Sequence, residues 1–498
     1  MSYMGLDIGT TACKAVVFDE KGRQLASAYR EYPTLIPQEG WAELDPRQVS
    51  ESCFTVIREA ASSCDDPVRA IGISCQGEAF TAVSSDREIL GNAMVSFDTR
   101  AAKIAEVWSD KFGRERLYEI TGHTTHSMFT LFKLLWLREN RPDIWSRAHR
   151  FYCFEDLIHH KLGLEPAISW PLAGQTMMFN VRTHQWDEAI LDSAGLDKSS
   201  LAWPLPSGAV VGTVPISTAR ELGLPDETIV VTGGHDQPCA ALGVGITSPG
   251  RAVYGIGTVE CICAALPSAI FSEELYRSNL WTYDYTFEGM YTTLAFSLTG
   301  GNLLKWFRDE WVRSEVDQAK RQGVNPYELI LNGMTDEPAN LMVLPYFTTS
   351  GTPYFDSEVA GAIIGLRLST KRSEVLRALL EGVAYEMRLN LEILDRSGIE
   401  VSELIAVGGG SKNRRLIQLK ADVMNRPITT VAVTEAGCLG VAMLACAAHT
   451  GQDTASLARY WVRATEVVEP NPENVACYND RFPMYLKLYP TLKTLAGK

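Results

Sequence analysis

Gly5-Leu6-Asp7-Ile8-Gly9-Thr10-Thr11-Ala12-Cys13-Lys14 lies at the start of this 498-residue chain and decides its fold. The stretch reads as an apolar strand, a tight Gly-Thr turn and a second apolar strand. Glycine lacks a Cβ and permits positive φ, so the backbone N–H groups of such a turn can approach an anion closely. Thr10 and Thr11 add hydroxyl donors, and Lys14 adds a cation suited to phosphate oxygens. The pattern predicts a phosphate-binding hairpin, although an ordinary β-hairpin would share it.

The acidic residue of this hairpin points to a metal ion. Asp7 precedes the turn, where its carboxylate would repel a bound phosphate. A divalent cation between the two groups removes the repulsion, and Mg²⁺ usually keeps several of its waters when it binds a carboxylate and a phosphate. We therefore predict that Asp7 holds Mg²⁺ through water.

A second hairpin of the same kind occurs in the middle of the chain. Residues 252–262 again combine two apolar strands with a Gly-Thr turn, at Gly257 and Thr258. Two facing hairpins could hold one polyphosphate from two sides. The stretch from Gly245 to Gly250, with its Pro-Gly pair, is typical of a domain joint. We predict two domains, residues 1–247 and 248–498, each a mixture of strands and crossing helices of the α/β class.

Composition limits the possible partners. The chain is 46% hydrophobic and 21% charged, with a net charge of −14, which disfavours nonspecific binding to nucleic acid or to an anionic membrane. The eleven cysteines are scattered without a Cys-x-x-Cys pair, which is typical of a reducing compartment. The sequence shows no signal peptide and no apolar stretch long enough to span a bilayer. We expect a cytoplasmic protein that binds neither nucleic acid nor membrane.

Polar residues follow several predicted strands. Gln76-Gly77-Glu78 ends a buried strand at 68–75, and Asp98 and Arg100 follow another apolar segment. A small hydroxylated substrate needs such donors and acceptors, so we predict that these side chains form a polyol pocket. Each motif taken singly could also be a surface turn.

Asp236 is the candidate general base. It follows the β-branched strand 228–232 and Gly233-Gly234, and a helix is expected at 238–244. Ligands of α/β sheets gather at the carboxyl ends of strands, where an acid near a phosphate can accept a proton from a hydroxyl. The alternative is that Asp236 only caps the following helix. We interpret His235 as a packed neighbour or, at most, a substrate contact.

A triple glycine marks a further turn. Gly408-Gly409-Gly410 lies between a predicted strand at 403–407 and a helix that begins near Asn413. The arrangement would let a ligand rest on backbone at a helix N-terminus. It matches neither a P-loop nor the dinucleotide fingerprint, and a tight strand-helix turn would have the same sequence.

Two longer stretches resemble the signatures of the FGGY carbohydrate kinases, within the actin-like ATPase superfamily. The first is 128–140, and the second runs over 361–366 and continues through 374–381. The resemblance extends from the first strand to the last helix. It implies two ribonuclease-H-like domains with a catalytic cleft between them, and a kinase that uses ATP and Mg²⁺.

The resemblance also implies roles for individual residues. It assigns the ATP phosphates to Asp7, Thr10, Thr11, Lys14, Gly257 and Thr258. It assigns the rest of the nucleotide to Gly301, Gly409, Gly410 and Asn413. It makes Asp236 the catalytic base and places Gln76, Gly77, Glu78 and Gln237 at the sugar.

The substrate is less closely defined. Xylulose kinases usually carry Met-His-Gly where this chain has Gln76-Gly77-Glu78, and glycerol kinases carry Arg-Glu. We expect a pentulose such as xylulose, with L-xylulose, ribulose, fuculose, erythritol and glycerol as alternatives. A non-catalytic actin-like regulator or chaperone is the rival class; it would need a DNA-reading or peptide-binding segment, for which the sequence shows no room. The sequence leaves the oligomeric state open, with a homodimer as one option.

Overall fold

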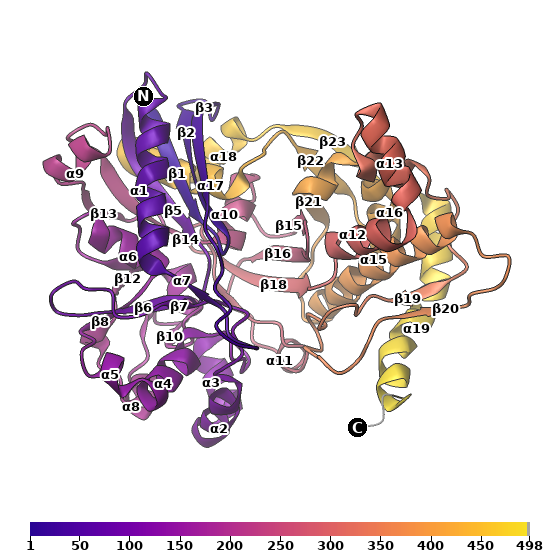
Figure 1. Cartoon of the computed structure of the whole chain (residues 1–498), viewed down its shortest axis with the longest axis horizontal. Helices are drawn as coiled ribbons and strands as arrows, with labels where there is room; N and C mark the ends of the chain where they lie inside the picture. Colours follow the sequence, from indigo (N-terminus) through magenta and orange to yellow (C-terminus); the bar gives the residue numbers. More distant parts are fainter. Residues whose placement is uncertain (496–498) are drawn as a thin grey trace.

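The computed structural model describes residues 1–495 and contains two large mixed β-sheets (Figure 1). The first sheet has the strand order β13 (Val210–Thr213), β14 (Ile229–His235), β5 (Val68–Cys75), β1 (Ser2–Ile8), β2 (Ala12–Asp19) and β3 (Gln24–Glu31). Strands β1, β2 and β3 form an antiparallel meander, and β5 and β14 run parallel to β1.

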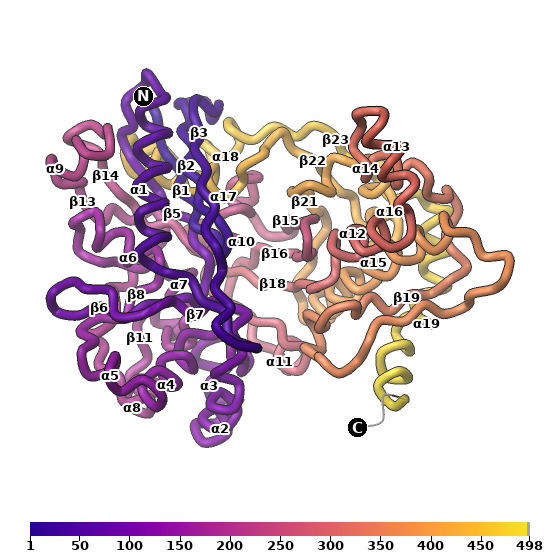
Figure 2. Tube along the Cα trace, in the orientation of Figure 1, coloured from indigo at the N-terminus to yellow at the C-terminus, as the bar shows by residue number. Residues whose placement is uncertain are grey.

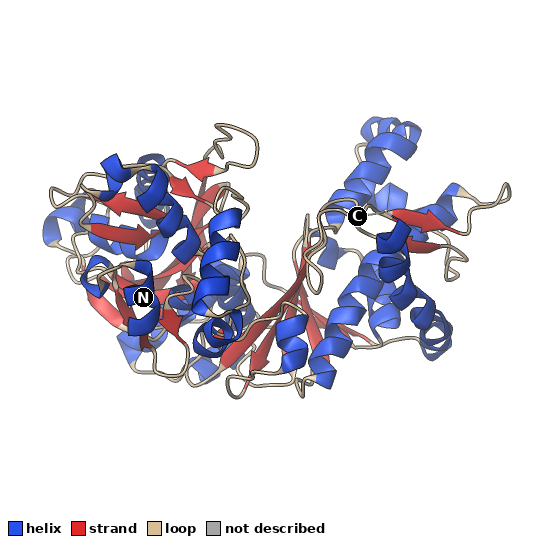
Figure 3. Cartoon of the chain, turned by 90° about the horizontal axis from the view of Figure 1, so that it is seen from below, coloured by secondary structure: helices blue, strands red, loops and turns tan. Residues whose placement is uncertain are grey.

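The second sheet repeats this plan. Its order is β17 (Tyr283–Asp284), β18 (Tyr291–Ser297), β16 (Glu260–Leu266), β15 (Arg251–Ile256), β21 (Glu403–Val407), β22 (Ile428–Val431) and β23 (Ala464–Val468). Here β15, β16 and β18 form the meander, and β21 and β22 run parallel to β15. The two sheets lie in separate lobes (Figure 3). The predicted α/β class with a repeated hairpin is confirmed.

Helices surround both sheets. Those of the first lobe and its connections are α1 (Pro46–Ser62), α2 (Ala102–Phe112), α3 (Arg114–Thr121), α4 (Thr130–Asn140), α5 (Pro142–Trp145), α6 (Phe154–Lys161), α7 (Trp170–Gly174), α8 (Glu188–Ala194), α9 (Ile216–Glu221) and α10 (Asp236–Gly243). The later helices are α11 (Glu273–Arg277), α12 (Gly301–Trp311), α13 (Arg313–Gln322), α14 (Pro326–Asn332), α15 (Arg372–Arg396), α16 (Arg414–Met424), α17 (Ala436–Thr450), α18 (Thr454–Trp461) and α19 (Pro472–Leu495). No helix of residues 1–495 is long and apolar enough to cross a membrane.

Short strands complete the fold. They pair as β4 (Glu43–Leu44) with β7 (Ala93–Met94), β6 (Phe80–Val83) with β8 (Arg150–Cys153), β9 (Ala167–Ser169) with β12 (Trp203–Leu205), β10 (Phe179–Asn180) with β11 (Gln185–Trp186), and β19 (Met342–Leu344) with β20 (Ala362–Ile364). Strand β5 has the predicted bounds. Strand β14 is longer than predicted, because the chain stays extended through Gly233-Gly234 and reaches His235.

Helix α17 lies close against the first sheet although it lies between β22 and β23 of the second sheet in the chain (Figure 2). Glycines on neighbouring strands permit this approach: a Cβ on Gly5 would lie 2.0 Å from Cys438 O, and one on Gly72 would lie 2.3 Å from Val441 O. Gly5 and Gly72 are register partners across β1 and β5. We call these two residues the glycine row. The predicted domain division at 247/248 stays a prediction, since α17 packs on the first sheet.

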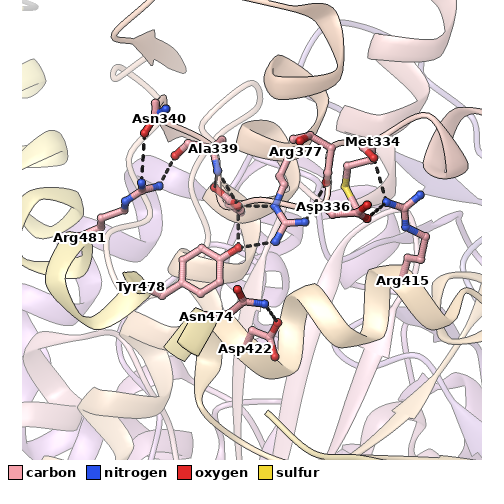
Figure 4. A network of polar contacts seen from close by, with 12 residues as sticks. Met334, Asp336, Ala339, Asn340, Arg377, Arg415, Asp422, Asn474, Tyr478 and Arg481 are labelled. Atoms are coloured by element: carbon pink, nitrogen blue, oxygen red, sulfur yellow. Dashed lines mark hydrogen bonds and ion pairs between the residues drawn. The ribbon is translucent and has the colours of Figure 1, made fainter. Parts of the chain in front are cut away.

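A polar network fixes the last helix to the second lobe (Figure 4). The Arg377 guanidinium on α15 contacts Glu381 at 2.8 Å and donates to Tyr478 Oη on α19 at 2.8 Å. Tyr478 Oη in turn donates to Glu381 Oε1 at 2.7 Å. Nearby, Arg415 on α16 pairs with Asp336 and donates to Met334 O. Arg377 also donates to Thr335 O at 3.0 Å, so both arginines hold the loop around 334–340 against the helices.

Candidate active site

The first Gly-Thr hairpin carries a paired acid and base. Asp7 on β1 and Lys14 on β2 are register partners, and Gly9 N donates to Ala12 O at 2.9 Å across the turn. Ser74 Oγ on β5 donates to Asp7 Oδ1 at 2.5 Å, whereas Asp7 Oδ2 accepts no hydrogen bond within residues 1–495. One carboxylate oxygen is therefore held in place while the other is available to a ligand.

Carboxylates gather around this hairpin. The pKa of Asp7 is raised to about 6, chiefly by burial, with the carboxylates of Asp236 and Glu435 adding to the shift and the Ser74 hydrogen bond and Lys14 opposing it. Lys14 Nζ forms an ion pair with Glu435 Oε1 at 2.7 Å. No group of three or more His, Cys, Asp or Glu residues in the described chain could hold a metal by itself. The single free carboxylate oxygen of Asp7 fits a hydrated cation such as Mg²⁺, which binds through one or two carboxylates and takes its other ligands from water and phosphate.

The second hairpin lies against the start of α12. Gly301 N donates to Gly257 O at 2.9 Å, and Asn302 N donates to Thr258 O at 3.1 Å. A Cβ on Gly301 would lie 2.6 Å from Gly257 O, so only glycine allows this contact. The Thr258 side chain is exposed, and its hydroxyl has no partner in the described chain. The structure thus brings Gly257, Thr258 and Gly301 together.

The triple-glycine turn lies beside the same hairpin. Gly409 opens a 3₁₀ turn (Gly409–Lys412), and a Cβ on Gly410 would lie 2.3 Å from Ile256 Cγ2 at the end of β15. A Cβ on Gly409 would meet no atom within 4 Å, so that side of the turn is open. Asn413 caps α16, with Oδ1 accepting from Leu416 N at 3.0 Å. These residues and the second hairpin form one contiguous region.

The Gln76-Gly77-Glu78 segment lies next to the first hairpin. The Gln76 amide donates to Gly9 O at 3.0 Å and accepts from Thr10 Oγ1 at 3.3 Å, so it braces the turn. Glu78 is buried with φ of 63°, and Thr130 and Lys133 donate to its backbone carbonyl. Its carboxylate has no hydrogen-bond partner in the described chain. Burial raises the pKa of Glu78, with Lys133 opposing and Asp236 adding to the shift.

Asp98 and Arg100 have other partners. Asp98 Oδ2 accepts from Ala42 N at 2.7 Å, and Arg100 pairs with both Asp98 and Glu43. The Arg100 guanidinium also lies over the Trp41 ring, 3.7 Å from its centroid. Apart from each other, the contacts named here include no predicted site residue. The pair holds the segment before α1, and its contact with a sugar stays a prediction.

Asp236 is the first residue of α10, directly after β14. Its side chain is 35% exposed, and Oδ1 lies 3.3 Å from His235 Nε2. Burial raises the pKa of Asp236 to about 6. Gln237 Oε1 accepts from Cys261 Sγ at 3.0 Å, which links this helix start to the second hairpin. A carboxylate with a pKa near 6 is mostly ionised at neutral pH and can accept a proton.

Three residues near these groups escaped the sequence analysis. Ser74 holds Asp7, Glu435 pairs with Lys14, and Tyr283 Oη shares a 2.9 Å hydrogen bond with His235 Nδ1. Ser74 lies within the predicted strand two residues before Gln76, so its place opposite Asp7 could have been inferred from the strand pairing. Glu435 and Tyr283 come from distant segments, and no local pattern marks them.

Comparison with known proteins decides the family. The model of the FGGY family of carbohydrate kinases, N-terminal domain, matches residues 2–243, and that of the C-terminal domain matches residues 252–449. The chain belongs to the FGGY family of carbohydrate kinases. The FGGY chain is therefore a phosphotransferase, and the predicted resemblance is confirmed.

Named relatives span nearly the whole FGGY chain. Xylulose kinase from Bacillus subtilis (strain 168) is 26% identical over 501 residues, covering 99% of this chain and 98% of that protein. Glycerol kinase from Koribacter versatilis (strain Ellin345) is 32% identical over 464 residues, covering 89% and 88%. The crystal structure of ligand-bound xylulose kinase from Lactobacillus acidophilus matches with a TM-score of 0.91 at 25% identity, covering 100% of this chain and 99% of that one. The FGGY fold thus extends through both lobes.

Proposed function

We propose that this FGGY kinase transfers the γ-phosphoryl group of ATP to a terminal hydroxyl of a small ketose, with a pentulose such as xylulose as the first candidate. The observation that carries the proposal is the position of Asp236. It is a partly exposed carboxylate at the end of β14, which neighbours β5 and β1 in the first sheet. Relatives named as xylulose kinases over full length support the pentulose. The relative named glycerol kinase keeps glycerol as the second candidate.

The residues suggest a division of labour. The β- and γ-phosphates would lie between the hairpin donors at Thr10, Thr11 and Lys14 and those at Gly257 and Thr258. Adenosine would rest against the open side of Gly409, beside Gly410 and Asn413. Mg²⁺, held by Asp7 through water, would neutralise charge on the transferred group. Asp236 would accept the proton of the attacking hydroxyl while the hairpin donors stabilise the charge that develops on phosphate.

Sugar recognition is assigned to the first lobe. Glu78 offers a buried carboxyl group with no hydrogen-bond partner among residues 1–495, and it lies close enough to Asp236 for their charges to interact. Gly77 lies beside Gln175 and His235, since a Cβ there would be 3.2 Å from Gln175 Cγ and 3.3 Å from His235 Cδ2. Gln237, Asp98 and Arg100 remain predicted contacts. The eleven free cysteines favour a reducing, cytoplasmic location, and a homodimer stays one option for the assembly.

The substrate is tested with a coupled ADP-release assay over D-xylulose, L-xylulose, ribulose, fuculose, erythritol and glycerol. We expect the highest kcat/KM on a pentulose. Faster turnover on glycerol than on every ketose would replace the pentulose by a polyol. No ADP release with any ketose or polyol would refute the proposed acceptor class.

Thr258→Val tests the second hairpin. The change removes an unpartnered hydroxyl and keeps the shape of the side chain. We expect KM for ATP to rise about tenfold, as for the loss of one hydrogen bond to a charged group, while the order of sugars stays unchanged. Thr258→Ser is the matched control and should stay near wild type. A changed order of sugars with unchanged KM for ATP would place the hairpin at the sugar.

Glu78→Gln tests the sugar pocket. The variant keeps the size of the side chain but replaces one carboxyl oxygen, which can accept a hydrogen bond, by an amide NH₂ group that can only donate. We expect KM for the best sugar to rise about tenfold, equivalent to ~1.4 kcal/mol, with KM for ATP unchanged. Sugars that lack the matching hydroxyl should be affected less. Steady-state kinetics on at least three sugars tests whether Glu78 contacts the sugar. An equal rise of KM for all of them would remove Glu78 from the pocket.

A further inference from the structure

Strand β14 contains a bulge between Val231 and Gly234, shortly before Asp236. Val231 pairs with Gly72 and Gly234 pairs with Ser74, so three residue steps on β14 oppose two on β5. One extra residue reverses the alternation of side chains in the rest of a strand, so the bulge decides which way the end of β14 faces. Gly233 lies in the bulge, where a Cβ would be 1.9 Å from Ile73 O.

In the bulge, the backbone N–H of Gly233 takes no part in the hydrogen bonds between β14 and β5. It donates to a buried carboxylate instead. Gly233 N donates to Glu155 Oε1 at 2.7 Å. The other oxygen, Oε2, accepts from Ser169 N at 2.7 Å and from Ser169 Oγ at 2.8 Å. Glu155 lies on α6 and is 0% exposed, and it forms no ion pair within residues 1–495. Its three hydrogen bonds therefore all come from β9 and β14.

Such a carboxylate is costly to bury. Burial raises the pKa of Glu155 to about 7, although the donors at Ser169 and Gly233 favour the ionised form. An apolar side chain at this position would leave the Gly233 and Ser169 N–H groups unpaired in the core. Glu155 thus has a specific task at this place: it joins the β9 strand to the bulge of β14.

We propose that Glu155 is a positioning residue for Asp236, acting through Gly233 and the β14 bulge; this rests on the proposed role of Asp236 as the base. Asp236 follows Gly233 by three residues and begins α10, so the path of the chain through the bulge sets where Asp236 lies. Glu155 touches neither sugar nor nucleotide in this arrangement. Its effect should appear in the chemical step and not in binding, because a small misplacement of a catalytic group slows the reaction strongly.

Glu155→Gln is the test. Glutamine keeps the size but offers one acceptor oxygen, so the N–H groups of Gly233 and Ser169 can no longer both be paired. We expect kcat to fall between ~10- and ~100-fold, with KM for ATP and for the sugar within about twofold. Ser169→Ala is the matched control, since it removes one donor to the same carboxylate and leaves the Gly233 bond. Its kcat should stay within about twofold of wild type.

The outcomes separate the two proposals. Wild-type kcat in Glu155→Gln, together with an inactive Asp236→Asn, overturns the positioning role alone. An active Asp236→Asn overturns the base and with it this inference. A loss of kcat in Ser169→Ala equal to that in Glu155→Gln would make the cluster merely structural. If Glu155→Gln does not fold, Glu155→Asp takes its place, because the shorter side chain keeps the charge and withdraws from Gly233, and the same loss of kcat with unchanged KM is expected.

Discussion

Asp236→Asn is expected to reduce kcat between ~10²- and ~10⁴-fold while ATP binding stays close to wild type. Asparagine has the same shape as aspartate, so the start of α10 and the Gln237–Cys261 contact should persist. What disappears is the group that accepts the proton of the attacking hydroxyl. Rapid-mix measurement of turnover and calorimetric titration of ATP together check the expectation. Near-wild-type turnover would show that another group is the base.

The pH profile provides an independent control. Burial raises the pKa of Asp236 to about 6, so the carboxylate is ionised above that pH and protonated below it. In the wild-type protein, kcat/KM for the sugar should therefore fall as the pH drops through about 6, roughly tenfold per pH unit. The residual activity of Asp236→Asn should lack this dependence. If kcat/KM of the variant still falls as the pH drops through about 6, the titration belongs to another residue.

Asp7→Asn is expected to reduce kcat/KM for ATP by ~10- to ~100-fold, with partial recovery at high Mg²⁺ concentration. The amide can still accept from Ser74 Oγ, so the hairpin should keep its shape. The lost charge weakens the attraction for a hydrated cation next to the phosphates. Initial rates over a series of Mg²⁺ concentrations measure the effect.

Ser74→Ala is the matched control for this prediction. It keeps the Asp7 carboxylate and removes only the bond that orients it, so its loss should be smaller and should respond less to added Mg²⁺. A loss in Asp7→Asn that Mg²⁺ does not relieve at any concentration would contradict a role in holding the metal.

The sequence predicted those parts of the fold that depend on local pattern. Alternating apolar residues and Gly-Thr turns located β1, β2, β15 and β16, and the bounds of β5 were predicted correctly. Gly233-Gly234 was interpreted as the end of a strand, yet the bulge lets β14 continue. A helix was expected from Pro238, whereas α10 begins at Asp236, because proline is tolerated in the first turn.

The candidate site was predictable only in part, because local pattern marks residues at strand ends and does not show which distant residues contact them. Residues at strand ends, such as Asp7 and Asp236, are marked by their neighbours in sequence. Glu155 lies on α6 and Glu435 lies directly before α17, and they contact Gly233 and Lys14 across large sequence separations. Asp98 and Arg100 were predicted from their place after a strand, but in the structure Arg100 forms ion pairs with Asp98 and Glu43. Sequence pattern finds polar residues but not their partners.

The glycine row has a consequence for motion between the lobes. Because α17 rests on backbone at Gly5 and Gly72, it must travel with the first sheet as one rigid body. The chain then passes between the lobes three times, near 244–250, 432–435 and 462–463. Bending that opens or closes the molecule is therefore confined to these short connections. Glu435 lies in the second of them, so its ion pair with Lys14 ties this connection to the first hairpin.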